Sequence, residues 1–349
     1  MPVTKGFFYS SVIPLLACSF LAAADKSFEG SLTVAAASSI SPDQPSDSEM
    51  VVLTVDKQKL QANLTTWPAD HSRAKSLSKF TVAIGKETGD KQTQGDNKTP
   101  EGIYLTQSVI PDSKLPAKYG PFAIPLDYPN PYDRLQGKTG YGIWLHGVIK
   151  DERVEEANVT EGCVAFYNAD ITRLTRWLKP HQGVVVIADD TSKVNQRSDV
   201  DSVVDATNDW ASAWAARDID RYASFYSKEF SNAGKNYRSY KEYKERVFKS
   251  YKVMKVGISN LRAVTHPKYA ISMMDQDFYG DERFSSIGRK ILYWVREDGG
   301  WKISREIYEN RRLEFVKLDP APSTVEDGMQ ATAVDSQGAA TSSSLPSRL

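Results

Sequence analysis

Two short stretches, Ile143–Gly147 (IWLHG) and Val159–Val164 (VTEGCV), decide how the first half of the chain is interpreted. The first predicts a β-strand that ends at His146, and Cys163 follows 17 residues later, directly after a glycine and before a predicted helix. An imidazole and a helix N-terminus can both lower the pKa of a thiol and make it a nucleophile. On spacing alone, a buried structural cysteine and an unrelated histidine remain an alternative.

If the pair is catalytic, each neighbouring group has an expected part. His146 takes the thiol proton and later protonates the leaving amine, while the carbonyl of Gly147 orients its second ring nitrogen. Gly162 lets the main chain approach closely, so the N–H groups of Gly162 and Cys163 are expected to face a developing oxyanion.

Composition limits the class of protein. The 349 residues suggest two domains, and 44 basic against 44 acidic side chains argue against a nucleic-acid partner. The mean hydropathy of −0.45 excludes a polytopic membrane protein. Two cysteines make neither a disulfide scaffold nor a four-cysteine zinc site. The remaining histidines, His71, His181 and His266, are isolated, so we expect no metal and no cofactor.

The N-terminal residues predict export. Residues 1–24 have one basic residue, a broken apolar stretch and a small-residue end, which is the layout of a signal peptide. Cys18 also fits a lipoprotein box, in which case the chain would be lipid-anchored. Residues 25–48 predict a flexible linker. Cys163 is then the single thiol of an exported protein.

The rest of the chain shows two patterns. Residues 49–190 hold short β-rich runs (51–55, 80–85, 103–106, 142–146 and 184–187) with one helix over 169–178, which predicts a mostly-β domain. Residues 191–200 predict a linker. Residues 201–315 hold three helical segments followed by strands over 253–264, 269–279, 285–296 and 301–307, which predicts an α+β domain. Residues 316–349 predict a disordered tail.

Several motifs of the first domain coincide in order with those of one family. His146-Gly147 followed by Thr160–Cys163, and the TPEGIY run at 99–104, resemble the L,D-transpeptidase catalytic domain (YkuD) family. Tyr128–Asn130 and Thr139–Trp144 are similar to loops of its YafK-like branch. The resemblance covers residues 50–190. It implies a β-sandwich with short helices and a periplasmic cysteine enzyme that acts on peptidoglycan stem peptides (muropeptides). Substrate-binding candidates are Tyr128, Tyr141, Trp144 and Thr160.

One departure from the family pattern is informative. The transpeptidases usually have arginine two residues after the cysteine, where this chain has Ala165. Members without it include hydrolases of the Csd6/Pgp2 type, L,D-carboxypeptidases that also carry an NTF2-like (SnoaL-like) domain. Residues 203–310 resemble such a cone-shaped domain. The resemblance implies that Cys163 forms a thioester and releases D-alanine after meso-diaminopimelate, trimming tetrapeptides to tripeptides. The alternatives are an L,D-transpeptidase that forms cross-links or attaches or detaches a lipoprotein, and a non-catalytic peptidoglycan-binding protein.

The second domain admits a structural and a functional interpretation. Its aromatic residues, including Trp210, Trp214, Phe225, Tyr226, Phe278, Tyr293 and Trp301, are expected to fill the cone. A pocket lined by Asp209, Asp275, Asp277, Arg305 and Glu306 is the alternative. We expect an accessory role, in binding substrate or in docking other cell-wall or cell-shape proteins.

Overall fold

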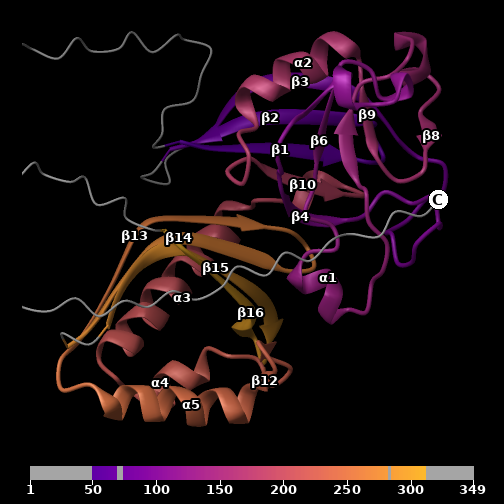
Figure 1. Ribbon diagram of the computed structural model, residues 1–349. Helices are drawn as coiled ribbons and strands as arrows, with labels where there is room; N and C mark the ends of the chain where they lie inside the picture. The colour runs from indigo at the N-terminus through magenta and orange to yellow at the C-terminus, as the bar shows by residue number, and fades with distance from the viewer. Residues whose placement is uncertain (1–48, 69–73, 282–283, 312–349) are drawn as a thin grey trace, which may run out of the picture. The chain divides into compact units, whose positions relative to one another are not determined.

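The protein is described by a computed structural model that covers residues 49–68, 74–281 and 284–311 (Figure 1). The predicted signal peptide, the linker over 25–48 and the tail over 316–349 lie outside the described residues, as do Cys18 and His71. Among the described residues, no helix is both long and apolar enough to cross a membrane.

Within the described residues, the first domain is built on one ten-stranded sheet in the order β4-β10-β1-β2-β3-β9-β7-β6-β5, with β8 pairing to β3. Its strands are β1 (Met50–Asp56), β2 (Gln61–Trp67), β3 (Lys75–Gly85), β4 (Gly102–Leu105), β5 (Ile110–Pro111), β6 (Phe122–Pro125), β7 (Trp144–His146), β8 (Asn158–Thr160), β9 (Val164–Phe166) and β10 (Val184–Ala188). The α-helices are α1 (Pro131–Leu135) and α2 (Asn168–Trp177), and short 3₁₀ helices are η1 (Asp112–Lys114), η2 (Ala117–Tyr119), η3 (Asp151–Val154) and η4 (Thr191–Lys193).

The sheet curls over one core. Beyond β4, Thr106 forms an antiparallel bridge with Leu126, which follows β6, so distant strands of the sheet meet. The mostly-β fold with short helices that the sequence predicts for the first domain therefore takes the form of one curled sheet with few helices. The enclosed core takes side chains from nearly every strand, among them Leu53, Leu64 and Phe166.

Three neighbouring strands, β4, β1 and β10, are buried on both faces. In β1, Leu53 and Val55 pack into the enclosed core, whereas Val52 packs against residues of the second domain. The same alternation holds in β10, where Val185 faces the enclosed core and Val184 the second domain. A strand buried on both faces is a continuous apolar run in sequence, which is why these strands were predictable.

The stretch predicted as a linker, 191–200, contains helical structure at both of its ends. It contains η4, and helix α3 (Arg197–Ala215) begins within it. Asn195 explains the order: its N–H donates to Thr265 O at 3.1 Å, and its Oδ1 accepts from Thr265 N at 2.8 Å.

The second domain packs helices on one face of an antiparallel sheet (Figure 1). Its helices are α3, α4 (Ile219–Ser224) and α5 (Tyr237–Ser250), and a small hairpin is formed by β11 (Ser231–Asn232) and β12 (Lys235–Asn236). The sheet consists of β13 (Met254–Thr265), β14 (Ala270–Gly280), β15 (Phe284–Glu297) and β16 (Gly300–Asn310). Alternate residues of β14 face opposite ways: Ala270, Met274 and Phe278 pack under the helices, while Ile271 and Met273 pack against the first domain.

Aromatic side chains fill the cone, with an ion pair among them. Glu306 lies 2.8 Å from Lys290 Nζ and accepts hydrogen bonds from the hydroxyls of Tyr240 (2.6 Å) and Tyr226 (3.2 Å). The Nζ atom of Lys244 lies 4.6 Å from the centre of the Trp214 ring. Burial raises the pKa of Glu306, but Lys290 and Lys244 outweigh it and hold that pKa at about 2.

Of the residues expected to line a pocket in the cone, only Glu306 does lie in the cone. Asp209 is exposed and pairs with Arg221, and Asp275 pairs with Arg311 on the other face of the sheet. Asp277 shares that outer face because of the two-residue period of β14. Arg305 alternates with Glu306 along β16 and so leaves the cone as well. Tyr293 packs between the domains rather than in the cone, for the same reason.

Glu306→Gln should destabilise the second domain strongly. The substitution leaves the charge of Lys290 buried without its carboxylate, and breaking such a pair costs about 3–5 kcal/mol. Urea denaturation followed by tryptophan fluorescence measures the loss. The matched control Asp209→Asn removes an exposed partner of Arg221 and should change the free energy of unfolding by about 0.5 kcal/mol or less. Equal losses in both variants would contradict the assignment.

Candidate active site

The pairing of β7 with β9 brings the predicted catalytic pair together. The two strands run parallel, with Leu145 opposite Val164 and His146 opposite Ala165. Cys163 directly precedes β9, and both His146 and Cys163 line one pocket of about 440 Å³. The two residues that sequence analysis placed 17 positions apart therefore lie on adjacent strands, two register positions from each other, and both face the same pocket.

The thiol of Cys163 is half-buried and its Sγ donates a hydrogen bond to Gly142 O at 3.4 Å. The expected helix N-terminus does not follow it, because β9 intervenes and α2 begins only at Asn168. Burial raises the pKa of Cys163 to about 11, against smaller lowering effects of the Trp144 backbone and Lys118. The sequence-based expectation of a lowered thiol pKa is wrong for this reason.

His146 is buried, with 6% of its surface exposed, at the end of β7. Its Nδ1 lies 2.5 Å from Gly147 O, the carbonyl that sequence analysis named. A carbonyl oxygen can only accept, so Nδ1 carries the hydrogen and Nε2 keeps its lone pair. Burial, with smaller contributions from the charges of Lys118 and Arg153, lowers the pKa of His146 to about 4, against the raising effect of its hydrogen bond to Gly147 O. At neutral pH the resting pair is a thiol and a neutral imidazole with a free basic nitrogen.

The turn before Cys163 is braced by Thr160. The hydroxyl of Thr160 donates to Cys163 O at 2.7 Å and accepts from Gly162 N at 3.1 Å. The Gly162 N–H is thus engaged inside the turn, which leaves the Cys163 N–H as the better placed of the two predicted oxyanion donors. Gly162 has φ +121°, and a Cβ there would lie 2.7 Å from Lys98 O, so a side chain does not fit.

The segment after His146 is held by Asn168, which sequence analysis did not single out. Asn168 Oδ1 accepts from Val148 N at 2.9 Å, and its Nδ2 donates to Val148 O at 2.9 Å. A Cβ on Gly147 would collide with the Asn168 side chain and lie 2.8 Å from Cδ of Pro121. This close packing fixes the carbonyl that orients His146.

The rim of the pocket is rich in basic residues, which the sequence analysis did not predict. Lys86, Lys118 and Arg153 line it with one acidic side chain, Glu161, while Lys91, also in the lining, is paired with Asp96 at 2.7 Å. Tyr119 packs its ring against His146 with 5.0 Å between ring centres. A pocket with this charge favours a ligand that carries carboxylates.

The predicted substrate-binding residues divide into two groups. Tyr141, with 76% of its surface exposed, and Thr160 line the pocket. Trp144 lies behind Tyr119, with 5.0 Å between ring centres, outside the pocket lining. Tyr128 is buried, and its hydroxyl donates to Thr139 O at 3.1 Å, so it supports a loop and does not face the pocket. Within the ranges that the structure describes, no three His, Cys, Asp or Glu side chains form a group suited to a metal ion.

Comparison with known proteins finds a matching family for each of the two domains. Residues 51–187 match the L,D-transpeptidase catalytic domain family (YkuD), and residues 202–307 match the Cds6 C-terminal NTF2-like domain family. The chain is 35% identical over 92 residues to the "Putative L,D-transpeptidase YafK" of Escherichia coli (strain K12). That match covers 26% of this chain and 32% of the relative, so the chain spans about a third of the length of the curated relatives it matches.

Two solved structures resemble the whole described chain. Bdellovibrio bacteriovorus Bd1075 is 28% identical with a TM-score of 0.66, over 76% of this chain and 94% of that one. The helical cell shape determining protein Pgp2 of Campylobacter jejuni is 23% identical with a TM-score of 0.63, over 75% of this chain and 92% of that one; this likeness concerns the fold alone. The first domain thus matches the L,D-transpeptidase catalytic domain family and the second an NTF2-like domain family, so the family resemblance and the fold class expected from the sequence are confirmed.

Alkylation of Cys163 by iodoacetamide should follow the raised pKa of its thiol. We expect slow labelling at pH 7, slower than that of free N-acetylcysteine, and a rate constant that still rises steeply above pH 9. Mass spectrometry of the peptide that contains Cys163 measures it over pH 5–11, and the control Cys163→Ser shows the labelling of Cys18 alone. A rate that stays high and constant down to pH 5 would instead show a thiolate–imidazolium pair at rest.

Proposed function

Because the chain carries an L,D-transpeptidase catalytic domain, we propose that it is a peptidoglycan-modifying cysteine enzyme whose reaction is that of an L,D-carboxypeptidase. The observation that carries the proposal is the meeting of His146, oriented by Gly147 O, with Cys163 in one pocket that has a basic rim. A stem tetrapeptide ends in the carboxylate of D-alanine, and Lys118 and Arg153 provide charges that attract it.

The first half of the reaction forms a thioester. Nε2 of His146 takes the thiol proton as Sγ of Cys163 attacks the carbonyl carbon between meso-diaminopimelate and D-alanine. The negative charge that develops on the carbonyl oxygen is stabilised by the N–H of Cys163. The tetrahedral intermediate then collapses, the imidazolium gives its proton to the amine, and D-alanine leaves. Cys163 retains the acyl group as a thioester.

Water completes the second half. His146 removes a proton from the attacking water, the thioester carbon–sulfur bond breaks, and the proton returns to the thiolate. The product is a stem tripeptide. A neutral resting pair suits this cycle, because the imidazole must be unprotonated at the start of each half.

The choice of water over a second amine rests on Ala165. This residue lies fully buried in β9, opposite His146 and paired with Ala83, where transpeptidases of the family usually carry arginine. The likeness to the cell-shape protein of Campylobacter jejuni supports the same branch, and a role in cell shape belongs to the proposal. L,D-transpeptidation, including attachment or detachment of a lipoprotein, is the second candidate, and the 35% identity to YafK favours it.

The proposal also covers location and the second domain. An enzyme of this kind works outside the cytoplasmic membrane, so we propose export to the periplasm by residues 1–24, with a lipid anchor if Cys18 is processed as a lipoprotein cysteine. The NTF2-like domain takes an accessory part, binding substrate or docking another cell-wall protein. A non-catalytic binder remains an outcome of the test below.

Purified protein incubated with disaccharide-tetrapeptide should release D-alanine and leave the tripeptide form. Cys163→Ala should lower kcat by about 10³-fold or more, because the nucleophile is lost, and His146→Gln should do likewise. The control Arg176→Ala alters an exposed residue of α2 and should keep wild-type activity. Liquid chromatography with mass spectrometry detects the loss of one alanine.

The other outcomes decide between the candidates. Cross-linked dimers or a released lipoprotein in place of the tripeptide would identify the transferase or amidase. Tight binding to sacculi with no product from any of these substrates would overturn the enzyme proposal.

A further inference from the structure

We infer that Lys268, in the turn between β13 and β14 of the second domain, is a positioning residue for two loops that form the wall of the active-site pocket. The inference rests on the proposed function only in taking Cys163 as the reacting thiol. Lys268 touches neither Cys163 nor the pocket. It acts through the carboxylates of Asp90 and Glu101, which belong to the first domain.

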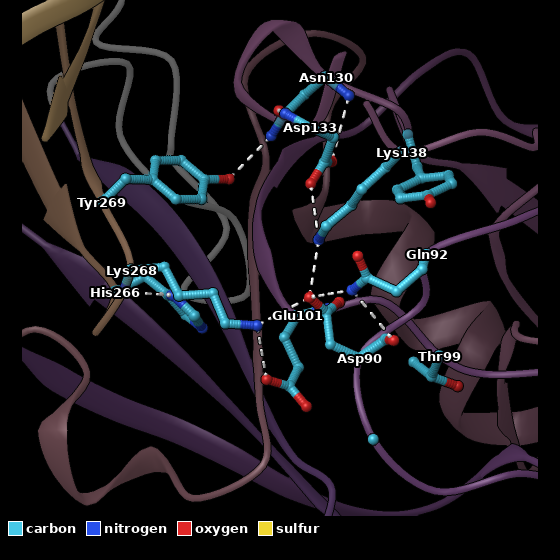
Figure 2. A network of polar contacts seen from close by, with 12 residues as sticks. Asp90, Gln92, Thr99, Glu101, Asn130, Asp133, Lys138, His266, Lys268 and Tyr269 are labelled. Atoms are coloured by element: carbon cyan, nitrogen blue, oxygen red, sulfur yellow. Dashed lines mark hydrogen bonds and ion pairs between the residues drawn. The ribbon is translucent and has the colours of Figure 1, made fainter. Parts of the chain in front are cut away.

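The contact is well defined. Lys268 Nζ lies 2.8 Å from Asp90 Oδ2 and 2.9 Å from Glu101 Oε2, as Figure 2 shows. The turn itself is rigid, because His266 N donates to Tyr269 O and Lys268 N donates to His266 Nδ1. The Lys268 side chain is 34% exposed, so its charge is only partly screened.

The two carboxylates are shared with buried lysines of the first domain. Lys138 Nζ lies 2.8 Å from Asp90 and 3.0 Å from Asp133, and Lys57 Nζ lies 3.0 Å from Glu101. Three lysines thus balance three carboxylates. Without Lys268, two buried lysines face three carboxylates, and the network must rearrange or take up a proton.

The network is continuous with the loop over residues 89–98, hereafter the 89–98 loop. Gln92 Nε2 donates to Asp90 Oδ2 at 3.0 Å (Figure 2). Glu101 N donates to Asp90 Oδ1 at 2.8 Å. Lys91, Gln94, Gly95 and Asn97 of this loop line the pocket. The position of Asp90 therefore sets where this wall begins.

A second loop, 138–142, is attached to the same network and reaches the thiol. Lys138 is its first residue, and Thr139 is bonded to the 89–98 loop twice, through Thr139 N to Gln92 O at 2.9 Å and Gln94 N to Thr139 Oγ1 at 3.2 Å. The loop ends at Gly142, whose carbonyl accepts the hydrogen bond from Cys163 Sγ. From the other side, Lys57 donates to Thr99 O, and Thr99 Oγ1 donates to Cys163 O at 3.4 Å.

Lys268 is not needed to hold the domains together. Tyr269 does that: its hydroxyl donates to Ile103 O at 2.9 Å and accepts from Ile103 N at 2.6 Å and Asn130 Nδ2 at 2.8 Å. Apolar packing that includes Ile271, Ile291 and Tyr293 adds to it. The charge of Lys268 can therefore be removed while the interface stays formed, which separates positioning from docking.

The test compares full-length Lys268→Met with wild type in three measurements: iodoacetamide labelling of Cys163, hydrogen exchange of residues 89–98 and 138–142, and the KM and kcat for disaccharide-tetrapeptide. Loosened walls should expose the thiol and raise its labelling rate about fivefold. They should also speed exchange in both loops and raise KM about fivefold, with kcat changed less than about twofold. Lys268→Arg keeps the charge and should restore wild-type values.

Two further variants distinguish the alternatives. Lys228→Met removes a lysine that pairs with Asp298 within the second domain and should leave every measurement at wild-type values. Tyr269→Phe should lower thermal stability while the KM effect stays smaller than in Lys268→Met. If Lys268→Met does not fold, Lys268→Gln takes its place.

Labelling and exchange rates within about twofold of wild type in Lys268→Met would overturn the inference. Both are read without substrate, so they decide the inference even if the tetrapeptide proves not to be the substrate. Failure of the proposed function appears separately, as absence of product with the wild-type protein.

Discussion

The parallel pairing of β7 with β9 is the constraint on which the candidate site depends. It fixes His146 opposite Ala165, and Cys163 stands one residue before β9. A one-residue slip would turn each side chain to the other face of the sheet and separate the pair. The glycines serve this pairing: Gly162 has no room for a Cβ beneath Lys98, and Gly147 has none beside Asn168. The geometry of the candidate site is thus set by backbone packing, and the carbonyl of Gly147 orients His146 where an acidic side chain could otherwise do so.

Burial decides the protonation state of that pair. It raises the pKa of Cys163 and lowers that of His146, so each group is held in its neutral form. The charge of Lys118 lowers the pKa of the thiol and also that of the imidazole. These two effects oppose each other in the transfer of the proton from Cys163 to His146. In the proposed mechanism the thiol of Cys163 is activated only when its proton moves to Nε2 of His146 during attack, so the thiolate exists only while a carbonyl is in place.

The sequence predicted those strands, helices and site residues that a pattern of neighbouring residues marks. The long strands β1, β3 and β10 and helix α2 were predicted because apolar runs and helical spacing mark them, and His146, Gly147 and Cys163 because ordered motifs surround them. The strand β2 was missed because its buried face consists of Ala62, Leu64 and Thr66, with one large apolar side chain, and β9 because three residues show no period. Lys118 and Arg153 come from separate 3₁₀ helices, so only tertiary structure brings them to the pocket. Lys268 belongs to the second domain, and only tertiary structure brings it to Asp90 and Glu101. Tyr128 was wrongly predicted to bind substrate, because only the tertiary structure shows that its side chain is buried and bonded to Thr139 O.

The second domain is part of the folding unit of the first. Strands β4, β1 and β10 present Ile103, Val52 and Val186 on the face away from the enclosed core, and these residues are buried only because Tyr269, Ile271 and Tyr293 cover them. A chain ending near residue 190 would expose this apolar face to water, at a cost of about 25 cal/mol for each Å² uncovered. The 89–98 loop, which lines the pocket of Cys163, leads into β4, one of these strands. An NTF2-like domain in this position therefore supports the shape of the pocket whatever else it binds.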